Sequence, residues 1–182
     1  DRGCSYLLKN NIYPHYIVGD FDSINRDDIK KLEIDSIKKF KYNCEKDSTD
    51  SDIAMEIALK MEFAEIYMMA MTGSRLDHSF ANLGLLSKAN SAGAKAYIIN
   101  ETNKIYLLEE SSKIKKDNSY RYISFLAYCD KVENFNIKNA KYDLENYTLY
   151  LGDNRTVSNE FLEEDIEVEF TKGKILVIFS KD

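Results

Sequence analysis

The segment IYMMAMTGSRLDHSFANLGLLSKANSAGAKAYII, residues 66–99, indicates the fold class. An apolar run at residues 66–71 precedes a polar loop, a helical stretch at residues 77–92 and a second apolar run at residues 96–99. Gly93 follows the helical stretch where a left-handed conformation needs a residue without Cβ. A strand, a helix and a second strand in this order predict a βαβ unit, whose two strands are parallel.

The same alternation continues toward the N-terminus. We expect strands near residues 16–18 and 36–40, and helices near residues 3–10, 26–33 and 51–62. The last helix has a clear apolar stripe at three-to-four spacing, formed by Ile53, Ala54, Ile57, Ala58 and Met61. Residues 1–108 are therefore predicted to form an α/β domain with a mostly parallel sheet.

The pattern changes after about residue 102, where β-branched and aromatic residues begin to alternate with polar ones. This alternation predicts an all-β region, with strands near residues 120–127, 148–151, 166–170 and 175–179. Lys172-Gly173 is predicted to form a hairpin turn between the last two. The polar stretch at residues 109–118 contains three lysines and is predicted to be a linker preceding a second domain, residues 119–182.

Composition and charge exclude several classes of protein. The 182-residue chain is 44% hydrophobic and 31% charged, and charges interrupt every apolar run, so we expect no membrane span. The net charge of −6 argues against a nucleic-acid partner, since phosphate backbones attract basic surfaces. Three widely spaced cysteines and the lack of a visible secretory segment predict a cytoplasmic protein.

Carboxylates follow two predicted strands of the first half. Asp20 and Asp22 lie one residue apart directly after the first strand, at the strand end where α/β sheets bind ligands. The alternative is a turn with helix-capping acids. A second group, residues 45–50 (EKDSTD), follows the next strand. Capping by Ser, Thr or Asp explains part of this group, but not three acids, a lysine and two hydroxyls in one loop.

A third polar group, TGSRLDH at residues 72–78, follows the strand at residues 66–71 and opens a helix. Gly73 and Arg75 beside a helix N-terminus are typical of an anion site. Taken singly, Asp77 could be only a cap and His78 a structural histidine. Together, three strand ends place several acids along one sheet edge, where their repulsion favours a shared cation. Hard oxygen ligands beside a phosphate site suit Mg²⁺.

These motifs resemble the thiamine pyrophosphokinase family. The matching segments cover nearly the whole chain in order: DRG (1–3), GDFDS (19–23), KDSTD (46–50), TGSRLDH (72–78) and VSNE (157–160). The chain departs from the family where Arg2 and Ser74 replace glycines that are more usual there, so backbone approach to phosphate is expected to differ slightly. The family also implies a strand before Asp1.

The resemblance implies a homodimer. An N-terminal α/β domain would bind ATP with Mg²⁺, and a C-terminal β-sandwich, residues 119–182, would help to form the thiamine site across the dimer interface. It implies catalytic roles for Asp20, Asp22, Asp50 and Asp77, of which the first three would also bind the metal. Phosphate or ATP binding is implied for Asp1, Ser23, Lys46, Asp47, Thr72 and Arg75, and thiamine binding for Asn82, Ser158 and Asn159.

The implied reaction transfers a diphosphate group from ATP to the hydroxyl of thiamine, giving thiamine diphosphate and AMP. Positioning and charge neutralisation would supply most of the catalysis. Any stacking on thiamine must come from Tyr or Phe, because the chain has no Trp. The alternatives are a haloacid-dehalogenase-like phosphatase, in which Asp20, Asp22 and Thr72 would act, and a non-catalytic nucleotide- or thiamine-binding module.

Overall fold

The computed structural model describes residues 2–19, 37–41 and 48–182. The chain forms two compact units, residues 1–62 and 63–182. Three helices and eleven strands are assigned in the described residues, so the predicted mixed α/β class is confirmed. No helix among these residues is both long and apolar enough to span a membrane.

The first unit contains helices and one parallel strand pair. Its elements are α1 (Arg2–Lys9), β1 (Tyr16–Gly19), β2 (Lys38–Lys41) and α3 (Asp50–Leu59). β1 and β2 pair in parallel, as the βα pattern predicts. A small core forms where Leu8, Ile17 and Ile37 pack with Cys4. The helix predicted at residues 26–33 lies outside the described residues.

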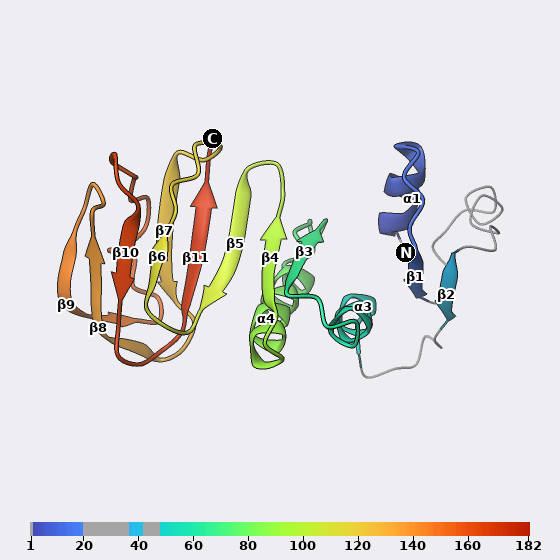
Figure 1. Cartoon of the computed structure of the whole chain (residues 1–182), viewed down its shortest axis with the longest axis horizontal. Coiled ribbons are helices and arrows are strands. Elements are labelled where there is room, and N and C mark those ends of the chain that lie inside the picture. Colours follow the sequence, from blue (N-terminus) through green and yellow to red (C-terminus); the bar gives the residue numbers. More distant parts are fainter. Residues whose placement is uncertain (1, 20–36, 42–47) are drawn as a thin grey trace. The chain divides into compact units, whose positions relative to one another are not determined.

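The second unit contains one helix and two sheets (Figure 1). Its elements in chain order are β3 (Glu65–Met69), α4 (Leu76–Ser91), β4 (Lys95–Ile99), β5 (Asn103–Leu108), β6 (Ser112–Ile114), β7 (Tyr122–Ala127), β8 (Lys131–Lys138), β9 (Leu144–Tyr150), β10 (Ile166–Glu169) and β11 (Ile175–Ser180). One sheet has the order β3-β4-β5-β11-β7 and the other β6-β10-β8-β9. β3 and β4 pair in parallel around α4, so the predicted βαβ unit is confirmed.

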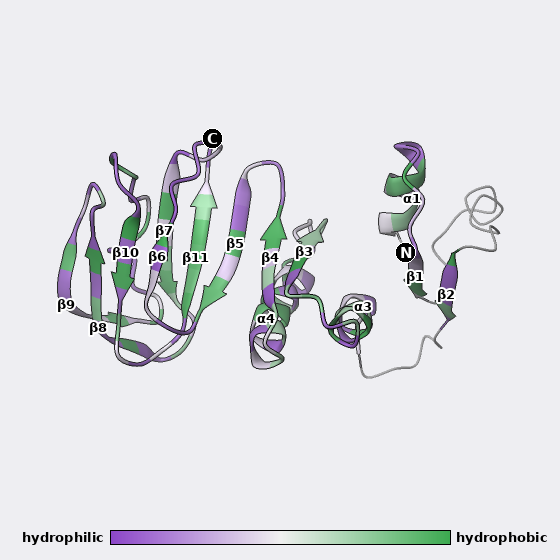
Figure 2. Ribbon diagram, in the orientation of Figure 1, coloured by the Kyte–Doolittle hydropathy of each residue, from purple (hydrophilic) through white to green (hydrophobic). Residues whose placement is uncertain are grey.

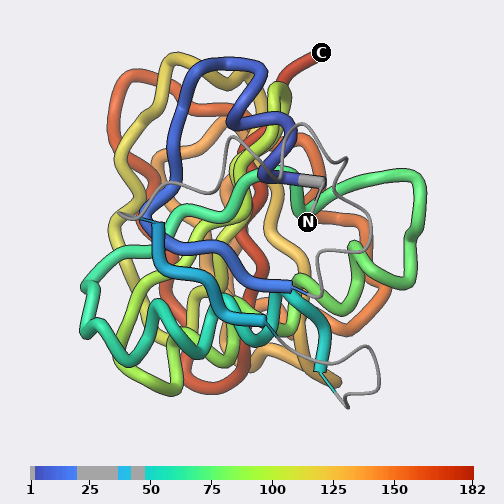
Figure 3. The backbone as a smooth tube through the Cα atoms, turned by 90° about the vertical axis from the view of Figure 1, so that its right-hand side faces the viewer, coloured from blue at the N-terminus to red at the C-terminus, as the bar shows by residue number. Residues whose placement is uncertain are grey.

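The five-stranded sheet joins the βαβ unit to the β-rich part of the chain. β4 pairs with β5 in antiparallel fashion, and β11 lies between β5 and β7 (Figure 1). Figure 3 shows the backbone from the side, where the red C-terminal segment that contains β11 ends at the C label. α4 packs against β4 and β5. Leu107 on β5 is buried on the face opposite to its neighbours Tyr106 and Leu108, which belong to the main core. β5 is therefore covered on both faces.

The main core lies between the two sheets. It contains Phe125, Val177 and Phe179 from the five-stranded sheet, and Phe135 and Leu149 from the four-stranded sheet. All five side chains are at most 2% exposed. Apolar positions run along β4, β10 and β11, whereas β2 carries hydrophilic residues (Figure 2). Burial of these side chains provides the main stabilisation of the second unit.

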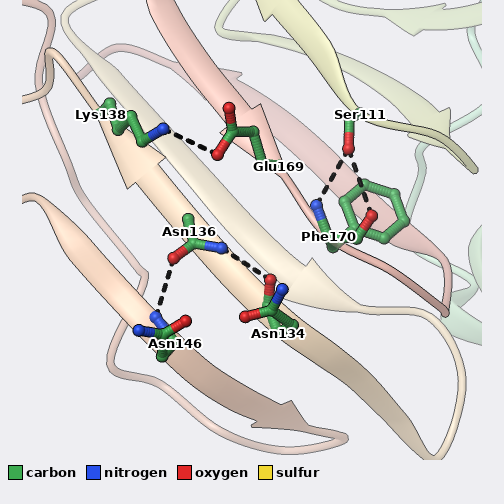
Figure 4. A network of polar contacts seen from close by, with 7 residues as sticks. All are labelled: Ser111, Asn134, Asn136, Lys138, Asn146, Glu169 and Phe170. Atoms are coloured by element: carbon green, nitrogen blue, oxygen red, sulfur yellow. Dashed lines mark hydrogen bonds and ion pairs between the residues drawn. The ribbon is translucent and has the colours of Figure 1, made fainter.

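The outer face of the four-stranded sheet is polar (Figure 4). Lys138 on β8 pairs with Glu169 on β10 at 2.8 Å, and Asn136 accepts a hydrogen bond from the backbone of Asn146 on β9. Ser111 Oγ accepts a hydrogen bond from the N–H of Phe170 and donates one to the carbonyl of Phe170. Exposed ion pairs of this kind add little stability, and we interpret this face as solvated.

The structure corrects two predictions in the β-rich region. The stretch at residues 109–118, predicted as a linker, contains β6, which pairs with β10. The predicted hairpin at Lys172-Gly173 is wrong, because β10 and β11 belong to different sheets. Gly173 instead takes the chain from one sheet to the other at φ 127°, and a Cβ there would lie 2.9 Å from Val132 Cα.

Candidate functional site

The loop after β3 presents an arginine and a carboxylate at the start of α4. Arg75 is the N-cap residue of α4, and its guanidinium donates two hydrogen bonds to Asp77, at 2.6 and 3.2 Å. This contact lowers the pKa of Asp77 from 3.8 to about 2, with a further contribution from the backbone N–H of His78. Asp77 is therefore ionised at physiological pH and orients Arg75, and it is not the N-cap of the helix.

Side chains from α4 and from the end of β4 hold this loop in place. Asn82 Nδ2 donates to the carbonyl of Met71 at 2.8 Å, and Asn100 Nδ2 donates to Thr72 Oγ1 at 3.0 Å. Ser79 Oγ accepts from the N–H of Gly73 and donates to the carbonyl of Arg75. These bonds fix the loop backbone while Arg75 and Asp77 remain about two-thirds exposed.

Asp50 is the first residue of α3 in the first unit. Thr49 is the N-cap of this helix, and its hydroxyl accepts from the N–H of Asp52 at 3.2 Å. The capping interpretation of the EKDSTD group is therefore confirmed for Thr49. Asp50 itself is half-buried, at a helix N-terminus that favours negative charge.

A second polar segment, residues 154–160, runs along the outer edge of β7. The backbones of Asn159 and Ile123 exchange two hydrogen bonds of 2.9 Å, and the N–H of Phe125 donates to the carbonyl of Thr156. The buried polar side chains of the described residues all belong to this contact: Ser124, Thr156 and Asn159. Ser124 Oγ accepts from the N–H of Ser158, whose φ is 58°. The segment is thus fixed, and Ser158 is presented at the surface.

Asn159 uses its side chain inside the protein. Its Oδ1 accepts from the N–H groups of Tyr142 and Glu160, and its Nδ2 donates to the carbonyl of Tyr142. With 3% exposure, this amide positions Tyr142, whose side chain is 59% exposed. The resemblance implies thiamine binding by Asn159, which stays a prediction, and the structure shows that its amide binds backbone groups.

A pocket of about 320 Å³ adjoins this segment. Ile137 forms part of its apolar wall, and Tyr142, Asp143, Arg155 and Asn159 contribute aromatic, charged and polar groups. The volume is at the lower end of the range for small-molecule sites, roughly 300–1,000 Å³. The pocket combines an exposed ring with both signs of charge.

The two polar segments lie at the same end of the five-stranded sheet but at its opposite edges. One row of paired residues crosses the sheet from β3 to the segment along β7: Met69, Ile99, Lys104, Phe179, Ile123 and Asn159. The row contains five strand spacings of about 4.8 Å, roughly 24 Å in total. Within one chain, the end of β3 at Met69 and the segment at Asn159 therefore lie at opposite edges of the sheet, roughly 24 Å apart along this row.

Several predicted site residues lie outside the described residues: Asp1, Asp20, Asp22, Ser23, Lys46 and Asp47. Within residues 2–19, 37–41 and 48–182, no group of three His, Cys, Asp or Glu side chains could hold a metal ion. The predicted roles of these residues remain predictions.

Two residues that contact these segments could not be singled out from the sequence. Asn100 lies outside any recognisable motif, and its role depends on a contact between the ends of β3 and β4. Tyr142 is one of thirteen tyrosines, and its position depends on a buried amide 17 residues later in the chain. The sequence signal that could have indicated Tyr142 is an aromatic residue beside a turn.

Comparison with known proteins gives matches along the whole chain. Residues 1–98 match the family model described as thiamin pyrophosphokinase, catalytic domain, and residues 111–175 match its vitamin B1 binding domain. Thiamine pyrophosphokinase of Bacillus subtilis is 33% identical over 183 residues, covering 100% of this chain and 86% of that protein.

Solved structures give the same result. The crystal structure of thiamine pyrophosphokinase from Bacillus subtilis has a TM-score of 0.94 at 31% identity, covering 100% of this chain and 86% of that one. The thiamin pyrophosphokinase from Geobacillus thermodenitrificans has a TM-score of 0.89 at 29% identity, with coverage of 100% and 84%.

The two family models first define a class: a transferase in which a catalytic part and a vitamin-binding part follow one another in one chain. Matches of this extent then identify the group within that class. The chain belongs to the thiamin pyrophosphokinase family. The phosphatase alternative is not favoured by these matches.

Proposed function

We infer that the protein catalyses ATP-dependent formation of thiamine diphosphate, transferring a diphosphate group to the hydroxyl of thiamine and releasing AMP. The observation that carries this conclusion is the match of both the catalytic and the vitamin-binding family models, in order, along one chain. The exposed Arg75 at the start of α4 supports it, because guanidinium groups and helix N-termini both bind phosphate.

We propose that Arg75 stabilises the charge that develops on the transferred group. Its pairing with Asp77 holds the guanidinium at the mouth of the loop, so less side-chain freedom is lost when phosphate binds. Thr72 adds a hydroxyl at the same loop. The phosphate contacts proposed for Asp1, Ser23, Lys46 and Asp47 rest on the motifs alone.

We propose Mg²⁺ as the cofactor, held by Asp20, Asp22 and Asp50. Carboxylate oxygens are the donors that Mg²⁺ prefers, and this set of three acids fits that preference. When bound, the ion would neutralise phosphate charge. Asp50 lies at the start of α3, which fixes the backbone of one of the three donors. Catalytic roles for these acids and for Asp77 remain part of the proposal.

For thiamine, we propose a site formed by Ser158 and Tyr142. The exposed Tyr142 ring and the Asp143 carboxylate in the adjoining pocket suit a cationic heteroaromatic ring. Asn159 would act by holding Tyr142 in position. We propose Asn82 as a further thiamine contact. Its Nδ2 donates to the carbonyl of Met71, so its Oδ1 is the atom that would bind the ligand.

We propose a homodimer in which each active site combines the Arg75 loop of one copy with the Ser158 segment of the other. The support is the row of paired residues: Met69, at the end of the strand before the Arg75 loop, is separated from Asn159 by roughly 24 Å within one chain, which is longer than a thiamine molecule. In this arrangement residues 1–108 form the α/β domain with a parallel N-terminal sheet, and residues 119–182 form a β-sandwich. We also propose a cytoplasmic location, supported by the unpaired Cys4 and Cys129.

The reaction is tested by incubating the full-length protein with thiamine, ATP and Mg²⁺ and separating the products. We expect AMP and thiamine diphosphate in equal amounts. ADP with thiamine monophosphate, or free phosphate alone, would contradict diphosphate transfer. Binding of both ligands without product would favour the non-catalytic alternative.

The shared site is tested by mixing two inactive variants, Arg75→Gln and Tyr142→Ala. In a mixed dimer one site carries both substitutions and the other carries neither, so activity returns on mixing. Refolding the two variants together allows subunits to exchange. A monomer by light scattering, or no recovery after mixing, would contradict the dimer proposal.

A further inference from the structure

The side chain of Asn100 has a fixed orientation. Its Oδ1 accepts from the backbone N–H groups of Thr102 and Asn103, at 3.0 and 2.7 Å, and from the side-chain amide of Asn103 at 3.1 Å. Backbone N–H groups can only donate, so the end of Asn100 that faces them must be the oxygen. The other end, Nδ2, is therefore the donor that reaches Thr72 Oγ1 at 3.0 Å.

This orientation determines what the Thr72 hydroxyl can do. A hydroxyl has one proton to donate, and an amide N–H cannot accept it. Because Asn100 donates to Thr72 Oγ1, the hydroxyl proton must point elsewhere. Among the residues that the structure describes, no protein acceptor takes it. Within the described part of the chain, Thr72 thus presents a free donor at the loop between β3 and α4, three residues before Arg75.

We propose that Asn100 is a positioning residue that makes Thr72 a hydrogen-bond donor to a phosphate oxygen of the nucleotide. This inference rests on the proposed function, since it concerns the direction of one hydrogen bond, from Thr72 to phosphate, in the same site. An acceptor at position 100 would turn the Thr72 proton toward itself, and lone pairs would then face the phosphate. Asn100 acts only through Thr72.

The conservative replacement Asn100→Asp reverses the polarity with little change of shape. A carboxylate keeps the acceptor for the turn at residues 102–103, so the fold is retained, but it has no N–H for Thr72. Thr72→Val removes the hydroxyl at similar volume, and Thr72→Ser keeps it. We expect Asn100→Asp and Thr72→Val each to weaken ATP binding about tenfold, since hydrogen bonds to charged groups are the stronger kind. Thr72→Ser, which keeps a hydroxyl, should bind ATP more tightly than Thr72→Val.

The test is a double-mutant cycle on the full-length protein. The dissociation constant of ATP is measured by calorimetry with Mg²⁺, without turnover, for the wild type, both single variants and the double variant. If Asn100 acts through Thr72, the double variant binds ATP no more weakly than the worse single variant. In steady-state assays the KM for ATP rises while the KM for thiamine and the Tm stay unchanged.

Three outcomes would overturn the inference, and a fourth would contradict only the proposed reaction. Additive losses in the cycle would mean that the new carboxylate repels phosphate directly. Unchanged ATP affinity in Asn100→Asp would mean that the contact has no part in binding. A wild type that binds ATP but makes no thiamine diphosphate would contradict the proposed reaction while leaving the cycle interpretable. A wild type that does not bind ATP would overturn both.

Discussion

The loop after β3 and the segment along β7 are built in opposite ways. At the loop, Arg75 and Asp77 are exposed and pair with each other. Along β7, Thr156 and Asn159 are almost fully buried and bind backbone groups. Exposed ion pairs exchange partners at little cost, whereas buried polar groups cannot lose theirs without a large penalty. The loop after β3 therefore suits binding of a phosphate group whose charge changes during the reaction. The segment along β7 suits holding the Tyr142 ring in a fixed position.

The largest expected effect is on Asn159. Asn159→Ala leaves the N–H and C=O of Tyr142 and the N–H of Glu160 without their partner, so we expect about 3 kcal/mol lower stability. Denaturant unfolding measures the change. Asn154→Ala in the same segment is the control, since Asn154 is exposed and should cost little. Equal effects of the two substitutions would contradict the assigned role of the buried amide.

Next is Arg75→Gln, which separates activity from stability. We expect kcat/KM to fall about 100-fold, the usual loss when one charge-stabilising donor is removed, with little change in Tm. The pKa of Asp77 should rise from about 2 toward 3.8, because its largest stabilising contact is gone. NMR titration of the carboxyl measures this shift.

The same pair sets a pH dependence with a definite sign. The pKa of Asp77 is lowered by folding, so the small stabilisation that this exposed pair provides is present above pH 3.8 and is lost as pH falls toward about 2. Acid unfolding of Arg75→Gln should lack this loss. An Asp77 carboxyl that titrates near 3.8 in the wild type would contradict the ion pair.

A smaller effect is expected at Thr156, whose hydroxyl donates to the carbonyl of Phe125. Thr156→Val should cost about 1–2 kcal/mol, because the carbonyl is buried. Thr171→Val is a matched control, since Thr171 also donates to a backbone carbonyl but is exposed. Thermal unfolding of both variants decides whether burial accounts for the difference.

The smallest expected effects compare two asparagines of α4. Asn82 donates to the carbonyl of Met71, and Asn90 donates to that of Leu107. Replacing either with Ala should cost about 1 kcal/mol of stability. Only Asn82→Ala should also lower kcat/KM, about fivefold, since Met71 precedes the Arg75 loop. A similar loss of activity in Asn90→Ala would mean that the effect is general destabilisation.

The sequence predicted the βαβ unit because α4 and its flanking strands keep a simple pattern. It did not predict β8, where register shifts between Val132 and Phe135 interrupt the alternation of buried residues. β5 was missed because burial on both faces makes Tyr106, Leu107 and Leu108 a continuous apolar run. Such a run fits a strand or a buried helix equally well.

The candidate site likewise has contacts that the sequence could predict and contacts that it could not. Arg75 and Asp77 lie in one short motif, so their contact could be expected from the sequence. The contacts of Asn100 with Thr72 and of Asn159 with Tyr142 join residues 28 and 17 positions apart. No local sequence pattern indicates which group the side-chain amide of a distant residue will bind. Those contacts follow from the sheet register, which sequence reasoning did not supply.

The position of β11 has a consequence for the synthesis of the protein. β11, residues 175–180, lies between β5 and β7, which precede it by about 50 residues or more. A nascent chain that has not yet released β11 from the ribosome leaves facing edges of β5 and β7 unpaired. Unpaired edges favour association between chains. We therefore expect ribosome-bound chains stalled before residue 175 to recruit chaperones, and chains whose β11 is carried beyond the ribosome by an added C-terminal linker to be released from them.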